Sequence, residues 1–514
     1  MTNKTVYDIL FVLFLTSICH ILFSKYGFNP TDEGFVLSAT NRVLHGQIPH
    51  VDFSSVRPLG YAYLHIPELL ISKTHFFLVS RFVFWFEQVL IAFLWVRFLL
   101  KYSKREISSF NKYALVIICF VFNVHYFPAS VLHTIDGLLM CMIGFNIIIL
   151  EKKWDFIGFL FIGFAALCKQ NYLVVLPVSL FLFGRKNSIL NFILGITPIV
   201  FYVVFVSING GWNDLTTQLS GHNELMDVGI FSYLFNPMLY AGVAGAFLYH
   251  KFKPNNILFT VLILLIAVIL LISNHYHGKY IFLFFGLLFG VTTHRFRQKD
   301  SIILPITTLL LAWCVSISVG YNTPALFVGG IISLILFDTI YSAKTESAKI
   351  AFGILFTTAI TFYYARTHNI YRDLSSNKLT YKLDNIVEGA TGIYTNKNTY
   401  SVLQELDSLK KIIPDLIVVP DFTACNVLHS HESKILTEWP NKTEIPNDKI
   451  LTKVTSKIQS NLSVVFAIPV FQTALLKDGF SPQENSGLNY PIVKFAKDNY
   501  KKNRYSTYFE LRSK

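Results

Sequence analysis

The chain has 514 residues, of which 53% are hydrophobic and 15% charged, and its mean hydropathy is +0.48. Soluble globular chains carry about 25% charged residues, so this composition excludes an ordinary soluble protein and indicates a polytopic membrane protein. The net charge of +13 does not indicate nucleic-acid binding, because much of the excess lies in short loops between apolar runs. The six cysteines form no CxxC pair, which argues against both a zinc signature and a disulfide framework.

Apolar runs recur from the N-terminus to about residue 364 and predict an α-helical membrane domain over residues 1–365. The sequence of residues 366–514 is polar throughout and predicts a small soluble α/β domain. No A-x-A cleavage site follows the first run, so we expect a retained span rather than a signal peptide. Thirteen spans are predicted, over residues 8–24, 76–100, 113–127, 131–150, 156–168, 171–183, 188–208, 231–249, 257–273, 279–293, 301–319, 325–341 and 349–364.

The distribution of lysine and arginine predicts how these spans are oriented. The run 156–183 fits either one long helix or two short ones that meet at Lys169. Two helices place fifteen basic loop residues on one side of the membrane and six on the other, whereas one helix breaks this asymmetry. The positive-inside rule therefore favours thirteen spans, a cytoplasmic N-terminus and an extracytoplasmic C-terminal domain. No eukaryotic sorting signal is evident, so the bacterial plasma membrane is the expected location.

The first outer loop, residues 25–75, is the densest group of polar residues on the predicted outer side. It contains Asp32 and Glu33, then Asp52, then the segment Arg57-Pro58-Leu59-Gly60-Tyr61. An acidic pair near a membrane surface is more often a solvated turn. A carboxylate can also take the proton of an acceptor hydroxyl, and a nearby cation can stabilise a departing phosphate. The loop is therefore the first candidate for an active site.

An acidic pair after the first span, followed by a basic-Pro-x-x-Tyr segment, resembles the GT-C glycosyltransferases. The protein O-mannosyltransferases and the aminoarabinose transferases that modify lipid A are the relevant relatives. The resemblance implies a sugar donor linked to polyprenyl or dolichyl phosphate, with Asp32 as the base of a single-displacement, inverting transfer and Glu33 beside it. Arg57 stands where the family has the lysine of Lys-Pro-Pro-x-Tyr, which contacts the donor phosphate, but the second proline is absent here.

The start of the fourth span and the corner at Lys169 supply further candidates. His133 and Asp136 are three residues apart and share a helix face. The resemblance implies a second acidic residue in this loop, which Asp136 matches, and the alternative is a polar helix end. Lys169 at a break between helices fits a phosphate contact, whereas the alternative is a lysine that reaches the membrane surface.

The segment Asn274–Tyr280 contains His275, His277 and Lys279. A His-x-His pair supplies only two ligands and zinc usually takes three or four, so no metal site is expected here. Contact of His275 or Lys279 with the donor phosphate is the sharper hypothesis. His133, Tyr61, Asp52 and His277 remain candidates for acceptor contacts. His222 and Glu224, in the loop 209–230, are weaker candidates, and that loop is expected to lie on the membrane surface.

Two short strands are predicted in the C-terminal domain, at 416–421 and 463–469, with a helix over 400–412.

The expected partners are a lipid carrier and a saccharide, lipid or protein acceptor, without nucleic acid. No Walker-type loop, GxGxxG or DxD motif was found, and no cofactor is predicted beyond the donor; metal dependence is left open. A transporter or flippase of lipid-linked saccharides, a saccharide polymerase or ligase, and a non-catalytic scaffold are the alternative functions. Internal repeats would favour a transporter, and none is seen.

Overall fold

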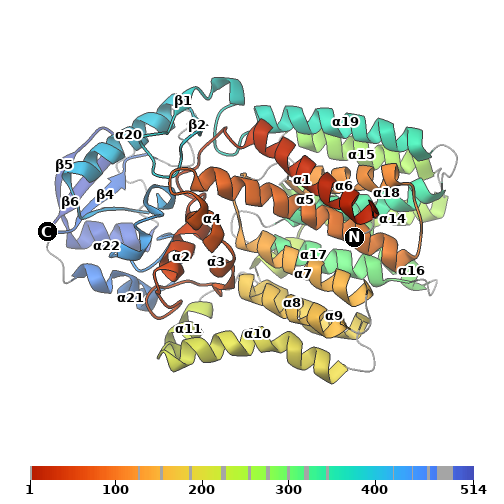
Figure 1. Ribbon diagram of the computed structural model, residues 1–514, viewed down its shortest axis with the longest axis horizontal. Helices are drawn as coiled ribbons and strands as arrows, with labels where there is room; N and C mark the ends of the chain where they lie inside the picture. The colour runs from red at the N-terminus through yellow and green to blue at the C-terminus, as the bar shows by residue number, and fades with distance from the viewer. Residues whose placement is uncertain are drawn as a thin grey trace.

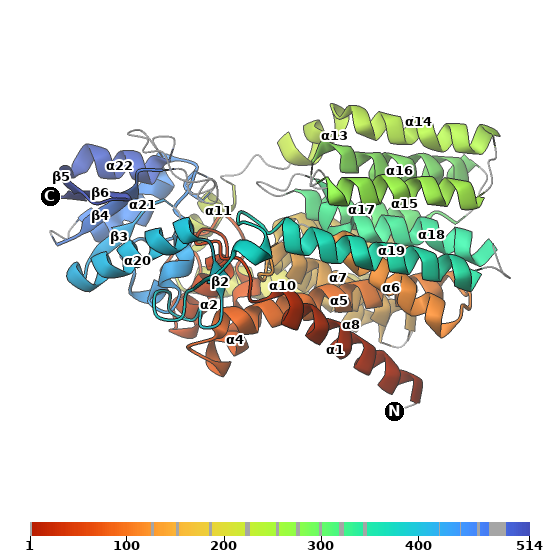
Figure 2. The same cartoon turned by 90° about the horizontal axis from the view of Figure 1, so that it is seen from above.

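The computed structural model describes residues 3–514 except 125–127, 151–153, 184–187, 221–226, 253–255, 274–277, 298–300, 318–322, 343–346, 421, 443, 460–462 and 472–489. A bundle of apolar helices forms one end of the molecule and a mixed α/β domain forms the other (Figure 1). Short helices of the first outer loop lie between the two parts, as both views show (Figure 2). Toward its N-terminal end, helix α1 runs away from the C-terminal domain (Figures 1 and 2).

A helix lies at each of the predicted spans. By length and composition, four helices are able to cross a membrane, or up to five if the bent pair Asp227–Leu234 and Pro237–Phe252 forms one span; the others are shorter apolar helices. The protein is therefore largely helical with several candidate spans, and thirteen crossings stay a prediction. The helices are α1 (Asn3–Phe23), α5 (Phe76–Ser103), α6 (Ser109–Val124), α7 (His133–Leu150), α8 (Asp155–Cys168), α9 (Val175–Phe183), α10 (Ser188–Ile208), α14 (Pro237–Phe252), α15 (Asn256–Ile272), α16 (Phe282–Arg297), α17 (Ile303–Ser316), α18 (Val328–Ser342) and α19 (Ser347–His368).

The predicted break at Lys169 is confirmed. Helix α8 ends at Cys168, the 3₁₀ turn η1 covers Gln170–Val174, and α9 follows. The turn is fixed to the start of α7, because the Tyr172 hydroxyl donates to the Thr134 carbonyl at 2.6 Å. Gly137 makes room for this contact, since a Cβ there would lie 2.3 Å from the Tyr172 ring. The corner therefore holds Lys169 beside the first turn of α7.

Three short helices build the first outer loop. They are α2 (Phe35–Leu44), α3 (Gly60–Leu64) and α4 (Ile66–Ile71). Helix α11 (Trp212–Leu219) packs beside this loop, where the Gln218 side chain bonds to the His50 ring at 2.7 Å and to the Ser55 amide at 3.0 Å. The loop 209–230 thus supports the first outer loop, whereas His222 and Glu224 lie outside the described residues.

The C-terminal domain is built on a four-stranded sheet of order β3-β4-β6-β5, in which β3 and β4 are parallel and the other neighbours are antiparallel. Both predicted strands and the predicted helix are confirmed. A separate pair, β1 and β2, bonds to the start of the outer loop, where the Tyr394 amide donates to the Lys25 carbonyl at 2.8 Å. The elements are β1 (Tyr381–Lys382), β2 (Tyr394–Thr395), α20 (Lys397–Ile412), β3 (Leu416–Val418), η6 (Thr423–Asn426), η7 (Ser430–Glu432), α21 (Asp448–Gln459), β4 (Val465–Pro469), α22 (Pro491–Asn499), β5 (Lys501–Tyr505) and β6 (Phe509–Ser513).

The outer loop and the C-terminal domain approach closely at Gly34, the residue before α2. A Cβ added there would lie 2.5 Å from the Cα and the amide nitrogen of Ala424 in η6. These are backbone atoms, so the contact cannot be relieved by rotating a side chain. Gly34 is therefore required by packing.

We predict that Gly34→Ala lowers the thermal unfolding midpoint, because overpacking of this kind costs about 1–3 kcal/mol. Gly353→Ala is the matched control, since a Cβ at Gly353 in α19 meets nothing within 4 Å and alanine favours a helix. The midpoint of both variants is measured in the same detergent. Equal midpoints for the two variants would contradict the close approach.

Candidate active site

The carboxylate of Asp32 is held in one orientation at the start of α2. Its Oδ2 atom accepts from the Asn29 side chain at 2.8 Å and from the Tyr371 hydroxyl at 2.8 Å, and the Arg372 guanidinium lies 3.1 Å away. Asn29 also accepts from the amide and hydroxyl of Thr31, an Asx turn that shapes the loop. Among the described contacts all the bonds end on Oδ2. The Asp32 side chain is 17% exposed, and no described bond ends on its Oδ1 atom.

Glu33 points inward and anchors the loop. Its Oε1 atom accepts from Arg81 Nε of α5 at 2.5 Å, and Arg81 also donates to the Gly27 carbonyl at 2.7 Å. Burial raises the pKa of the Glu33 carboxyl, and the Arg81 guanidinium opposes this shift. The geometry gives Glu33 a structural part, although it was predicted beside Asp32 as a catalytic residue.

Two arginines of the outer loop form buried ion pairs with the C-terminal domain. Arg42 pairs with Glu438 at 2.5 Å, and Arg57 pairs with Glu444. Burial raises the pKa of Glu438 to about 7, with Arg42 acting in the opposite direction. Glu444 also accepts from the Val56 amide at 3.1 Å. The charge of Arg57 thus fixes the loop to the C-terminal domain, and its contact with the donor phosphate stays a prediction.

Phe35 is the centre of a buried group that we call the Phe35 cluster, which consists of Phe35, Arg57, Tyr61, His133 and Trp439. The Phe35 ring lies 6.2 Å from the Tyr61 ring, 5.8 Å from the His133 ring and 5.5 Å from the Trp439 ring, centroid to centroid, and 5.6 Å from the Arg57 guanidinium carbon. The rings of Tyr61 and His133 are 5.5 Å apart. The structure thus brings together Arg57, Tyr61 and His133, which were predicted separately.

Several polar atoms of the Phe35 cluster are buried without a partner in the described structure. They are the Tyr61 hydroxyl, both ring nitrogens of His133 and the indole nitrogen of Trp439. Buried polar groups in proteins are nearly always hydrogen-bonded, so a group of unpartnered ones indicates a place for a polar ligand. Arg57 and Lys169 both lie within electrostatic range of His133. The cluster therefore offers donors and positive charge, which suits an anion.

Lys169 is buried and donates to the Thr134 hydroxyl at 3.1 Å. Thr134 directly follows His133 in α7, and Lys169 lies within electrostatic range of His133. Asp136 belongs elsewhere, because its Oδ1 lies 3.2 Å from His65 Nε2. No described contact joins Asp136 to Asp32. The predicted pairing of these two carboxylates in one catalytic group is therefore without support in the described contacts.

The remaining predicted residues take other positions. Asp52 accepts from the Ile48 amide at 2.6 Å and closes a turn. Lys279 lies 5.7 Å from the ring centre of the neighbouring Tyr280, and no described contact joins it to Arg57 or Lys169. His275 and His277 lie outside the described residues. Trp439 was not predicted as a site residue. The only indication in the sequence is that it is a tryptophan within a polar segment.

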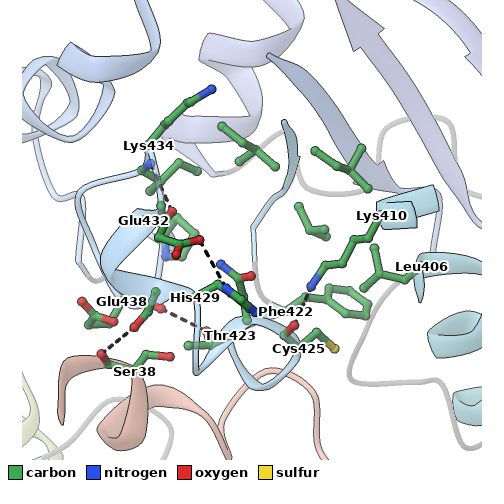
Figure 3. Close-up of a pocket in the computed structure, with 18 of the residues that line it drawn as sticks. Ser38, Leu406, Lys410, Phe422, Thr423, Cys425, His429, Glu432, Lys434 and Glu438 are labelled. Atoms are coloured by element: carbon green, nitrogen blue, oxygen red, sulfur yellow. Dashed lines mark hydrogen bonds and ion pairs between the residues drawn. The ribbon is translucent and has the colours of Figure 1, made fainter. Parts of the chain in front are cut away.

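A polar cavity of about 500 Å³ lies between α2 and the C-terminal domain. In Figure 3, Ser38 and Glu438 lie at the lower left of the cavity, His429 and Glu432 near its centre and Lys410 at the right. Arg42 also lines it. Phe35, Ser38 and Arg42 follow at helical spacing in α2. Phe35 lies in the Phe35 cluster, whereas Ser38 and Arg42 line the cavity.

Comparisons with known proteins found one family match and one similar solved structure. Residues 58–294 match the model of glycosyltransferase family 87, a range that includes Tyr61, His133 and Lys169. No curated protein matches the chain. Among solved structures, the archaeal oligosaccharyltransferase AglB from Archaeoglobus fulgidus, in complex with an inhibitory peptide and a dolichol-phosphate, is similar at 12% identity and a TM-score of 0.46, covering 91% of this chain and 70% of that chain. The chain is a GT-C-like membrane glycosyltransferase, as the sequence predicted.

The ion pair of Arg57 with Glu444 generates a test of stability. We predict that Glu444→Gln lowers the free energy of unfolding by about 3–5 kcal/mol, because it leaves the buried Arg57 charge uncompensated. The double variant Arg57→Met with Glu444→Gln should recover much of this loss. Asp407→Asn is the control, since Asp407 pairs with Lys411, which is 70% exposed, and exposed pairs contribute about 0.2–1 kcal/mol. Denaturant unfolding compares the wild type with the three variants, and a double variant no more stable than Glu444→Gln would contradict the pairing.

Proposed function

We propose that the protein transfers a sugar from a polyprenyl-phosphate carrier to an acceptor hydroxyl, with inversion, on the outer face of a bacterial plasma membrane. The observation that carries this proposal is the Phe35 cluster. Its unpartnered hydroxyl, imidazole and indole groups lie near the positive charges of Arg57 and Lys169. A lipid phosphate needs such donors and cations, and no nucleotide-binding motif is present in the sequence.

Asp32 is the proposed general base. The three partners on Oδ2 prevent the carboxylate from turning. The free Oδ1 takes the proton of the acceptor hydroxyl while the acceptor oxygen bonds to the anomeric carbon. The bond from the anomeric carbon to the phosphate oxygen breaks at the same time, and its electron pair leaves with the lipid phosphate. One displacement inverts the anomeric centre.

The Phe35 cluster is the proposed site of the phosphate. Asp32 is separated from Phe35 by two residues at the start of α2, so the base and the cluster lie at the same end of one helix. Lys169, Tyr61 and His133 would donate to the phosphate oxygens, and Arg57 would add charge while it remains paired with Glu444. Groups fixed in a buried site stabilise a departing anion more strongly than water does.

The polar cavity of Figure 3 is the proposed acceptor site. Ser38 and Arg42 of α2 line it, on the helix that begins at Phe35, and its volume of about 500 Å³ falls within the range of small-molecule sites. Its charged and hydroxylated lining suits a polar acceptor such as a glycan. This arrangement gives the C-terminal domain a part in recognising the acceptor.

Two alternatives keep the lipid-linked saccharide but change the outcome. A transporter or flippase would move the saccharide without forming a glycosidic bond, and the match to a glycosyltransferase family disfavours it. A polymerase or ligase would use a second lipid-linked saccharide as acceptor. Product analysis with a labelled donor separates these functions, because only the transferase and the polymerase or ligase create a new bond, and their products differ in whether lipid remains attached to the acceptor.

We predict that Asp32→Asn lowers the rate of sugar transfer by about 100-fold or more, since general base catalysis contributes roughly 10²–10⁴. Asp52→Asn is the matched control, because its remaining amide oxygen still accepts from Ile48 and the turn is kept. Transfer from a radiolabelled polyprenyl-phosphate sugar is measured in proteoliposomes, and folding is checked by the thermal midpoint. If the folded Asp32→Asn protein transfers sugar at the normal rate, Asp32 is not the base.

We expect Lys169→Met to weaken binding of the donor by about 10-fold or more, because it removes a buried cation beside the phosphate site. Lys73→Met is the control, since Lys73 is an exposed lysine of the same outer loop. The inhibition of transfer by sugar-free polyprenyl phosphate measures the affinity of both variants. Equal inhibition constants for the wild type and Lys169→Met would exclude the phosphate role of Lys169.

A further inference from the structure

A second group of ionisable side chains lies apart from the Phe35 cluster and has no part in the proposed transfer. His65, between α3 and α4, meets Glu87 of α5 and Asp136 of α7. One ligand atom of each residue lies within 4.8 Å of those of the other two. The three residues are 1%, 6% and 0% exposed. Three separate elements thus place an imidazole and two carboxylates around one point.

The orientation of the His65 ring is fixed by a fourth residue. His65 Nδ1 lies 2.6 Å from Glu68 Oε1, so this nitrogen carries the hydrogen that the carboxylate accepts. The other nitrogen, Nε2, faces Asp136 at 3.2 Å. Histidines that bind metal ions usually donate their second ring N–H to a carboxylate in this way. Glu68 therefore orients His65 with Nε2 directed at Asp136, where a bound ion would take the place of a proton on Nε2.

The carboxylates lack the partners that buried charges require. Asp136 Oδ2 and Glu87 Oε2 are buried and have no hydrogen-bond partner in the described part of the chain. Among the described contacts of the two carboxylates, His65 is the basic group, whereas Lys169 donates to Thr134. Burying ionised carboxylates without compensation is expensive, and such groups are either protonated or coordinate a metal ion. The unpartnered oxygens thus point to a missing cation or a shared proton.

From this geometry we propose that His65, Glu87 and Asp136 bind one divalent transition-metal ion, of the class of Zn²⁺ or Mn²⁺. One imidazole and two carboxylates suit these ions, and three protein ligands leave a further position open. Two oxygen or nitrogen ligands of one zinc ion lie at most about 4.4 Å apart, twice the metal–ligand distance. Small side-chain rotations bring the present atoms to that spacing.

The ion would connect the outer loop to two membrane helices. His133 and Asp136 are three residues apart in α7 and share a face, so an ion at Asp136 fixes the turn that also positions His133. Binding of the ion does not depend on the transfer reaction, because its ligands lie outside the group that we propose for the donor phosphate. Failure of either proposal leaves the other standing.

The test is the metal content of the full-length protein. The purified protein is stripped with a chelator, incubated with Zn²⁺ or Mn²⁺ and freed of unbound ions by gel filtration, and its metal is measured by mass spectrometry. We expect about one equivalent in the wild type and at least about a 10-fold weaker affinity in Glu87→Gln. Glu388→Gln is the matched control, because Glu388 and His429 form a 56% exposed acid–histidine pair, and it should bind as the wild type does.

The thermal midpoint separates a metal ion from a shared proton. With a metal site, the chelator lowers the midpoint of the wild type, added metal restores it, and Glu87→Gln responds to neither. With a proton shared by Glu87 and Asp136, Glu87→Gln mimics the protonated acid, is as stable as the wild type, and the chelator has no effect. That result, or a wild type that retains no metal, overturns the proposal. If Glu87→Gln does not fold, the wild-type measurements alone decide.

Discussion

Burial of charge in the first outer loop is the constraint on which the rest of the structure depends. Glu33 is paired with Arg81 of α5, whereas Arg42 and Arg57 are paired with Glu438 and Glu444 of the C-terminal domain. All of these groups are nearly inaccessible to water, so separating any pair would leave an uncompensated buried charge, at a cost of about 3–5 kcal/mol. The loop is thereby fixed on both sides. The first outer loop therefore lies as a fixed segment between the helical bundle and the C-terminal domain.

The fixed loop explains how residues far apart in the sequence become one site. Helix α2 begins at Phe35, directly after Asp32 and Glu33, and its first turn faces Tyr61, His133 and Trp439. Since Glu33 is anchored to α5, the adjacent Asp32 cannot move away from this turn. A carboxylate base and an anion site are useful only when their separation is maintained, because catalysis depends on groups that are already oriented before the reaction. In the proposed function the ion pairs act by keeping the loop rigid, and the C-terminal domain contributes Trp439 and the partners of Arg42 and Arg57 to the proposed site.

The sequence predicted the features that depend on local composition. Hydropathy located the helices, the lysine and arginine distribution located the break at Lys169, and apolar runs located β3 and β4. The contacts of the outer loop could not be predicted from the sequence, because Arg57 and Glu444 are 387 residues apart and no local pattern joins them. Trp439 and the arrangement around His65 were missed for the same reason. Glu87 could have been singled out from the sequence, since a carboxylate inside an apolar span usually marks a functional site.

The most direct measurement is a structure of the protein with a bound polyprenyl-phosphate sugar in a lipid environment. The account predicts the phosphate in contact with Lys169 and the Phe35 cluster, with the anomeric carbon on the side of Asp32 and its free Oδ1. A phosphate bound elsewhere, with the Tyr61 hydroxyl and the His133 nitrogens still unoccupied, would contradict the account.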